Sequence, residues 1–129
     1  MDLSSPGGLS VNDGIDLDEF TLQYITVDQI IRMISTYGVG ALMAKFDVEA
    51  AYRIPSDRYL LGLKWRKNYF VDLALSFGLR SAPYIFNSVA DMVEWILLNT
   101  HNVSDLLHYL DDFITAGSSD TNQCAENFL

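Results

Sequence analysis

The sequence predicts an α+β fold in which an antiparallel sheet packs on two or three helices. Three observations lead to this expectation. Apolar residues recur at helical spacing in residues 26–37 and 81–99, short apolar or alternating runs predict strands, and turn signals join neighbouring strands into hairpins. The order is helix, strand, hairpin, helix, hairpin. A chain of 129 residues, 50% of them hydrophobic, has enough material for one core.

Residues 1–25 are expected to form an irregular segment ahead of the first helix. Pro6-Gly7-Gly8 and Asn12-Asp13-Gly14 are strong turn signals. Three acids follow in residues 16–19, and the plain interpretation of such a stretch is a solvated loop.

The first helix is predicted over residues 26–37. Thr26 and Gln29 have the spacing of a capping box, in which each side chain bonds the backbone N–H of the other residue. Gly38 is a suitable C-terminal stop. We expect this helix to serve as scaffold.

Three strands are expected next. Residues 41–48 predict a buried strand, because their apolar run is short and nearly continuous. Residues 59–65 and 69–75 predict a hairpin that turns at Arg66-Lys67-Asn68, and the second arm alternates between apolar and polar residues.

The second half of the chain predicts one long helix and one more hairpin. The helix covers residues 81–99, with Ser81 as its N-cap and Pro83 in its first turn. The hairpin covers residues 106–116, and a further helix begins near residue 121.

Composition limits the classes of function. The net charge is −9, and six of the eight basic residues lie between Arg53 and Arg80, so this middle segment would have to face any nucleic acid. Cys124 is the only cysteine, which excludes an intrachain disulfide and a cysteine metal cluster. The N-terminus does not have the pattern of a secretory signal, and the longest apolar runs are too short to cross a membrane. We expect an intracellular protein without a membrane partner, and composition does not decide between nucleus and cytoplasm.

Two adjacent carboxylates, Asp111 and Asp112, are predicted at the tip of the hydrophobic hairpin. Like charges this close repel, and the sequence places no obvious cation beside them. Asp47 ends another predicted strand. Three strand-borne carboxylates suit Mg²⁺ and phosphoryl-transfer chemistry. The plain alternative is a solvated turn in an unrelated acidic interaction domain.

Three segments of the sequence then resemble motifs A, B and C of reverse transcriptases, in the order of that family. Phe46-Asp47-Val48-Glu49-Ala50-Ala51-Tyr52 resembles motif A. Residues 75–86, which read Leu-Ser-Phe-Gly-Leu-Arg-Ser-Ala-Pro-Tyr-Ile-Phe, resemble motif B. Tyr109-Leu110-Asp111-Asp112 resembles the Tyr-X-Asp-Asp box of motif C.

Within that family the chain is most similar to the DIRS-type, tyrosine-recombinase retroelements. Residues 10–15, 61–65 and 108–113 are typical of this group. The resemblance implies a palm over residues 26–117, a residual fingers segment over residues 1–25 and the start of a truncated helix over residues 118–129. It also implies incomplete fingers and no thumb.

The resemblance assigns a role to each acid of the motifs. It implies that Asp47 and Asp111 bind two Mg²⁺ ions, with Mn²⁺ as a possible substitute, and that the Val48 carbonyl is a further metal ligand. Asp112 would support the metals electrostatically. The implied partners are an RNA or DNA template-primer and a deoxynucleoside triphosphate.

The same resemblance assigns the nucleotide and primer contacts. Ala51 and Tyr52 match the nucleotide pocket, in which Tyr52 would be the gate that rejects a ribose 2′-OH. Phe77 and Gly78 match the turn that lies against the incoming nucleotide. Tyr109 would pack near the primer end.

Some features of the sequence favour a non-catalytic protein over an active polymerase. About four residues that the family has between Ile54 and Pro55 are missing, and the basic fingers strand is absent. The alternative function is therefore a non-catalytic remnant that acts at most as a metal-binding or interaction module, and exposed apolar palm surface would favour self-association. We expect Trp65 and Trp95 to be core residues rather than base-stacking platforms, and His108 to be a satisfied strand residue without a catalytic role.

Overall fold

The computed structural model describes residues 2–49, 62–71, 73–76, 78–101 and 103–126. They form an α+β structure with an antiparallel sheet, as the sequence predicts. The chain divides into two compact units, one made of Met1–Leu22 and Ala50–Phe86 and the other of Gln23–Glu49 and Asn87–Leu129. Each unit is described separately below.

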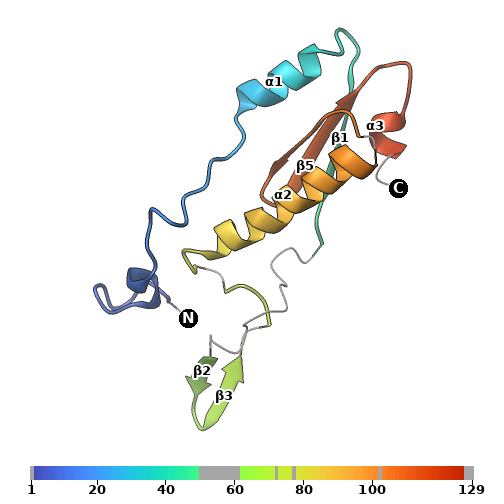
Figure 1. Cartoon of the computed structure of the whole chain (residues 1–129). Helices are drawn as coiled ribbons and strands as arrows, with labels where there is room; N and C mark the ends of the chain where they lie inside the picture. The colour runs from blue at the N-terminus through green and yellow to red at the C-terminus, as the bar shows by residue number, and fades with distance from the viewer. Residues whose placement is uncertain (1, 50–61, 72, 77, 102, 127–129) are drawn as a thin grey trace. The chain divides into compact units, whose positions relative to one another are not determined.

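The second unit is built around a three-stranded antiparallel sheet (Figure 1). Its strands are β1 (Leu42–Asp47), β4 (Leu106–Tyr109) and β5 (Asp112–Gly117), in the order β1-β5-β4. β4 and β5 form the predicted hairpin, and β1 pairs along the full length of β5. Strand β1, which carries motif A, and strand β4, which leads into motif C, therefore lie on either side of β5.

The register gives the sheet two different faces, because side chains of directly paired residues share a face. On one face Phe46, Phe113 and His108 form a row across the three strands. Phe113 is fully buried and stacks on both neighbours, with ring centroids 4.8 Å from Phe46 and 5.3 Å from His108. The next row, which lies on the other face, consists of Asp47, Asp112 and Tyr109.

Three α-helices are present in the described residues: α1 (Val27–Ser35), α2 (Ala82–Thr100) and α3 (Gln123–Glu126). Thr26 and Gln29 form the predicted capping box of α1. Within the second unit, α2 meets the Phe113 face through Glu94, whose carboxylate bonds His108 on β4. Helix α3 contacts β1 and β5, and it approaches so closely that a Cβ on Gly117 would lie 3.0 Å from the Cβ of Cys124.

The first unit contains a 3₁₀ turn, η1 (Val11–Gly14), and a two-stranded hairpin of β2 (Gly62–Trp65) and β3 (Asn68–Val71). The buried side chain of Asn12 connects η1 to the Gly78 turn. Its Nδ2 donates to the Gly78 carbonyl at 2.7 Å, and its Oδ1 accepts from the Arg80 N–H at 2.8 Å.

Several elements depart from the sequence predictions. β1 is half-buried rather than buried, because α2 meets only one face of the sheet. β3 ends at Val71 rather than residue 75, and the hairpin turns at Arg66-Lys67, with Trp65 opposite Asn68. Helix α3 has four residues in the described part of the chain. The predicted strand residues 59–61 lie outside the described residues.

The prediction that both tryptophans are core residues was wrong. Trp65 is 65% exposed on β2, and Trp95 is 62% exposed on α2. The strand and helix patterns identify the elements correctly, but they do not show which positions of an element another element covers.

Candidate functional site

The motif A and motif C carboxylates lie at one end of the three-stranded sheet. Asp47 is directly opposite Asp112 in the β1–β5 register. Asp111 occupies the tight turn between β4 and β5, and its carbonyl accepts a hydrogen bond from the Val48 N–H at 3.1 Å. The structure therefore brings together two segments that are far apart in the sequence, at the position where the sequence predicts a site.

The turn of the hairpin has an unusual backbone at Leu110. This residue has φ of +54°, a region that side chains other than glycine and asparagine rarely adopt. Such a conformation costs on the order of 1 kcal/mol for an L-residue with a Cβ. It allows Tyr109 and Asp112 to pair directly while only Leu110 and Asp111 make the turn.

Lys45 is the neighbour that the sequence argument missed. Its Nζ lies 2.9 Å from Oδ1 of Asp112. The hydrogen bond and charge of Asp112, followed by the charges of Asp47 and Asp111, raise the pKa of Lys45 above its ordinary value. The expectation that no cation lies beside the acidic pair was therefore wrong.

A sequence signal for Lys45 does exist. Residues two apart on a strand share a face, so Lys45 and Asp47 both point to the exposed side of the sheet. Lys45 pairs with Ile114, which makes Asp112 its diagonal neighbour on β5. With the register between β1 and β5 in hand, the sequence would have predicted that Lys45 lies beside Asp112.

The donor set fits Mg²⁺ in part. Asp47 and Asp111 supply carboxylate oxygens, the ligand type that this hard cation prefers. In the described residues, no three histidine, cysteine, aspartate or glutamate side chains are grouped closely enough to hold one metal ion. Mg²⁺ sites of phosphoryl-transfer enzymes often use one or two carboxylates and complete the shell with substrate phosphates and water. The pair fits a site of that kind and not a closed cage.

Tyr109 lies on the same exposed row as the carboxylates. It is directly opposite Asp112 and is 47% exposed. Its ring packs against Tyr24, with centroids 4.8 Å apart and planes tilted by 37°. The ring is therefore supported on one side and accessible at the end of the sheet.

His108 is satisfied within the fold, as the sequence interpretation expected. It is 8% exposed, Nδ1 lies 2.5 Å from Oε2 of Glu94, and Nε2 lies 3.4 Å from Oδ1 of Asp91. These contacts attach β4 to α2 immediately before the Tyr109–Asp112 turn. The sequence did not indicate these partners, because they lie on a separate element.

Of the predicted nucleotide-binding residues, Gly78 is the one that the structure describes. Gly78 belongs to the other unit, where its φ of +84° and the hydrogen bond from Asn12 define a turn. A hollow of about 220 Å³ opens beside that turn, with Leu75 and Arg80 among its lining residues. Ala51, Tyr52 and Phe77 lie outside the described residues, as does the Ile54–Pro55 deletion.

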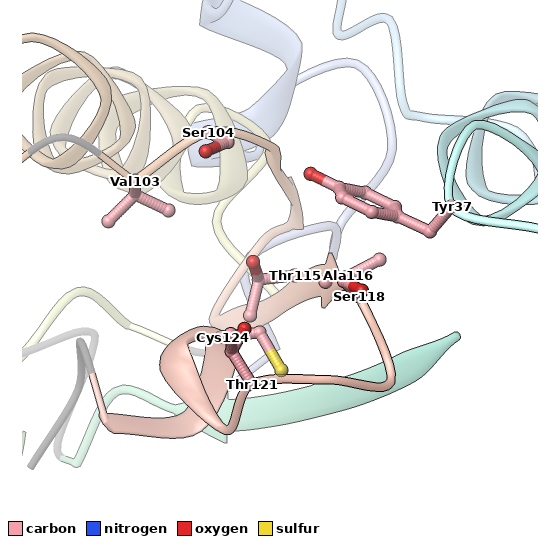
Figure 2. A pocket seen from close by; sticks show the side chains of 9 residues that line it. Tyr37, Val103, Ser104, Thr115, Ala116, Ser118, Thr121 and Cys124 are labelled. Carbon is pink, nitrogen blue, oxygen red and sulfur yellow. The ribbon is translucent and has the colours of Figure 1, made fainter. Parts of the chain in front are cut away.

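A second hollow, of about 280 Å³, opens near the other end of the three-stranded sheet (Figure 2). Six of its nine lining residues carry a hydroxyl or thiol group: Tyr37, Ser104, Thr115, Ser118, Thr121 and Cys124. The Tyr37 hydroxyl donates to Asp105, and this bond, with partial burial, raises the pKa of Tyr37 to about 12. The hydroxyl of Thr115 donates to the Asp105 carbonyl at 2.6 Å. These bonds join β5, the segment after α1 and the segment before β4, and so give the hollow a structural role.

Comparisons with protein-family models, with curated proteins and with solved structures found no match to this chain. Among the described residues, no helix is both long and apolar enough to cross a membrane. The motifs and the geometry of the carboxylate end of the sheet are therefore the features that point to a function.

Proposed function

We propose that this chain is the palm of a reverse transcriptase-type polymerase that transfers deoxynucleotides to a primer 3′-OH on a nucleic-acid template. One observation carries the proposal. The register places Asp47 opposite Asp112, with Asp111 in the adjoining turn, so the carboxylates of two separate motifs converge on one exposed sheet end.

The residues of this end have distinct roles in the proposed reaction. Asp47 and Asp111, with the Val48 carbonyl, would hold Mg²⁺ together with the nucleotide phosphates. If bound there, the metal would supply Lewis-acid chemistry: a lower pKa for the primer hydroxyl and stabilisation of the negative charge on the leaving pyrophosphate. Asp112 adds negative charge beside the metal ligands, and Lys45 orients its carboxylate. Tyr109 offers an exposed ring at the primer side of the row.

Primer extension tests the proposed activity directly. The whole chain is mixed with a primed RNA template, deoxynucleoside triphosphates and Mg²⁺ or Mn²⁺, and the reaction is repeated with Asp111→Asn and Asp47→Asn. We expect extension to fall roughly a thousandfold in either variant, because each removes a charge that stabilises the transition state. Glu49→Gln, an exposed acid two residues after Asp47, is the matched control and should extend normally.

A second candidate function is a non-catalytic palm that binds metal without synthesis. The ion pair between Lys45 and Asp112 favours the absence of synthesis, because the ammonium group already neutralises the carboxylate that would support the metals electrostatically. Mn²⁺ titration separates the candidates. Metal binding that Asp111→Asn abolishes, without any extension, supports the second function. The absence of both binding and extension in folded protein would contradict both.

A further inference from the structure

A row of stacked rings lies on the opposite face of the sheet from the carboxylates. Each ring belongs to a residue that is adjacent in sequence to one member of the exposed row Asp47, Asp112 and Tyr109. The ring planes of Phe46 and Phe113 differ by 14°, and those of Phe113 and His108 by 29°. Because the rings are in contact across all three strands, a shift of His108 is passed through Phe113 to the backbone beside the carboxylates.

His108 is the member of the ring row that bonds to α2. Its Nδ1 donates to Oε2 of Glu94 at 2.5 Å, and its Nε2 lies 3.4 Å from Oδ1 of Asp91. The Asp91 side chain is 64% exposed, so water screens that contact and it contributes little to stability. The Glu94 side chain is only 25% exposed, and its bond is short. The bond to Glu94 is therefore the contact that fixes β4 against α2.

Strand β4 has less support within the sheet than β5. In the order β1-β5-β4, β5 pairs on both of its edges, whereas β4 pairs only with β5 among the described strands. β4 is also short, with four residues, and His108 is the residue before its last one. A strand with few contacts opens locally more readily than a central strand. The bond from His108 to α2 therefore supports β4 at the end that leads into the turn.

The turn that follows β4 depends on this support. Leu110 has φ of +54°, and such a conformation persists only where the surrounding structure holds it. The Asp111 carbonyl accepts from the Val48 N–H at 3.1 Å, and this bond joins the motif C turn to the end of β1. If β4 moves away from α2, the turn can relax and this bond can break. The position of Asp111 beside Asp47 therefore depends on what holds β4.

We propose that His108 is a positioning residue for the carboxylate end of the sheet. Its bond to Glu94 holds β4 against α2 and so keeps Asp111 in the turn beside Asp47. The His108 ring is on the opposite face from the carboxylates, so it acts on them through the backbone and the ring row and not by contact. Its effect on metal binding rests on the proposed function, whereas its effect on the turn does not.

Amide hydrogen exchange at Val48, measured by NMR on the whole chain, reports the position of the turn without any metal. Glu94→Ala leaves the buried ring in place and should speed Val48 exchange about tenfold, because the bond to the Asp111 carbonyl then opens more often. Amides in the middle of β5 should keep their protection. Glu94→Gln still accepts from the ring and should exchange like the unmodified chain. Asp91→Ala, one turn away on α2, is the matched control and should do the same.

Calorimetry with Mn²⁺ measures the consequence for the metal site. Glu94→Ala should weaken Mn²⁺ binding about tenfold, and Glu94→Gln should restore it to within about twofold of the unmodified chain. Both variants remove the same charge, so the difference between them separates positioning from long-range attraction of the metal. Val103→Ala, which removes buried methyl groups before β4, should lower the melting temperature and leave Mn²⁺ affinity unchanged. That control separates positioning from a general loss of stability.

Several results would overturn the proposal. Unchanged Val48 exchange in folded Glu94→Ala would do so, as would equal acceleration in Asp91→Ala. If Glu94→Gln binds Mn²⁺ as weakly as Glu94→Ala, the charge matters and the bond to His108 does not. If the unmodified chain neither binds Mn²⁺ nor extends a primer, the polymerase proposal fails, and Val48 exchange still decides the role of His108. Failure of one proposal is therefore distinguishable from failure of the other.

Discussion

Lys45 is the residue that most alters the interpretation of the carboxylate cluster. Its ammonium group and a divalent cation would compete for the negative charge of this cluster, because Nζ lies 2.9 Å from Asp112 and the charges of Asp47 and Asp111 also act on it. A lysine in this position stabilises the acids while no metal is bound. It also adds positive charge that a metal ion bound beside it would be repelled by.

The first prediction follows from this competition. Lys45→Met should tighten Mn²⁺ binding about two- to fivefold, the range expected for an exposed ion pair. Lys45→Arg keeps the positive charge and should bind Mn²⁺ like the unmodified chain. Isothermal titration calorimetry with Mn²⁺ measures both variants. Weaker binding in the methionine variant would mean that Lys45 supports the metal site instead of competing with it.

Tyr37 provides a prediction about pH. Its pKa rises from 10.0 to about 12, first because its hydroxyl donates to Asp105 and then because of burial. The raised pKa means that the folded chain keeps a proton that the unfolded chain releases. The contribution of Tyr37 to stability is therefore fully present below pH 10 and is lost as pH rises through 12.

Tyr37→Phe should lower the free energy of unfolding by about 1 kcal/mol at neutral pH, after allowance for partial exposure. The difference from the unmodified chain should shrink above pH 10. Urea denaturation at several pH values measures both the loss of unfolding free energy at neutral pH and its decrease at high pH. If the difference in unfolding free energy stays constant across that pH range, the stabilisation by the Tyr37 hydroxyl does not depend on Asp105.

At the residue scale, the sequence identified the three aspartates as candidates for a metal site and missed their surroundings. Asp47, Asp111 and Asp112 could be found because the motifs are local strings. The partners of these acids and of His108 come from other strands and helices, and a single sequence contains no register. Trp65 was misassigned for a related reason, since a strand pattern does not reveal whether a further strand covers it.

At the scale of elements, local signals were the most accurate. The capping box of Thr26 and Gln29 set the start of α1, because both residues and both hydrogen bonds lie within one turn. The hairpin of β4 and β5 was also correct, since its turn has only two residues. The extent of β3 was not, because strand length depends on pairing partners.

The Asn12 side chain is the element-scale contact that we predict to be most sensitive. Its amide donates to Gly78 and Ser4 and accepts from the Arg80 N–H, so it joins η1 to the Gly78 turn. Asn12→Asp preserves the shape but replaces the hydrogen bond to the Gly78 carbonyl with repulsion between oxygens, while the Ser4 hydroxyl can turn to donate to the new carboxylate. We expect about 2–3 kcal/mol of destabilisation within the first unit.

Amide hydrogen exchange locates this effect. The Arg80 and Leu79 amides should exchange faster in Asn12→Asp, while amides of β4 and β5 in the other unit should keep their protection. Ser10→Ala, which removes only exposed capping contacts of η1, is the control and should change little. Uniform loss of protection in both units would show that Asn12 acts on the whole chain.

At the scale of the whole molecule, opposite tendencies meet in one short chain. Exposed apolar side chains favour association. Three of them lie on one face of α2: Met92, Trp95 and Ile96, which are 55%, 62% and 36% exposed. The net charge of −9 at pH 7 opposes association because each molecule repels the next. Which tendency prevails depends on pH and salt.

The chain should therefore be monomeric at neutral pH and low salt and should associate as pH falls towards its isoelectric point near 4.3. High salt at neutral pH should have the same effect, because screening shortens the reach of the repulsion to a few ångströms. Sedimentation velocity across both series measures the assembly. The double variant Met92→Gln, Trp95→Gln should remain monomeric under conditions in which the unmodified chain associates, while Asp91→Asn, which removes charge beside the same face, should associate at a higher pH. If the double variant associates as readily as the unmodified chain, the α2 face is not the contact, and the exposed rings of the β2–β3 hairpin become the surface to vary next.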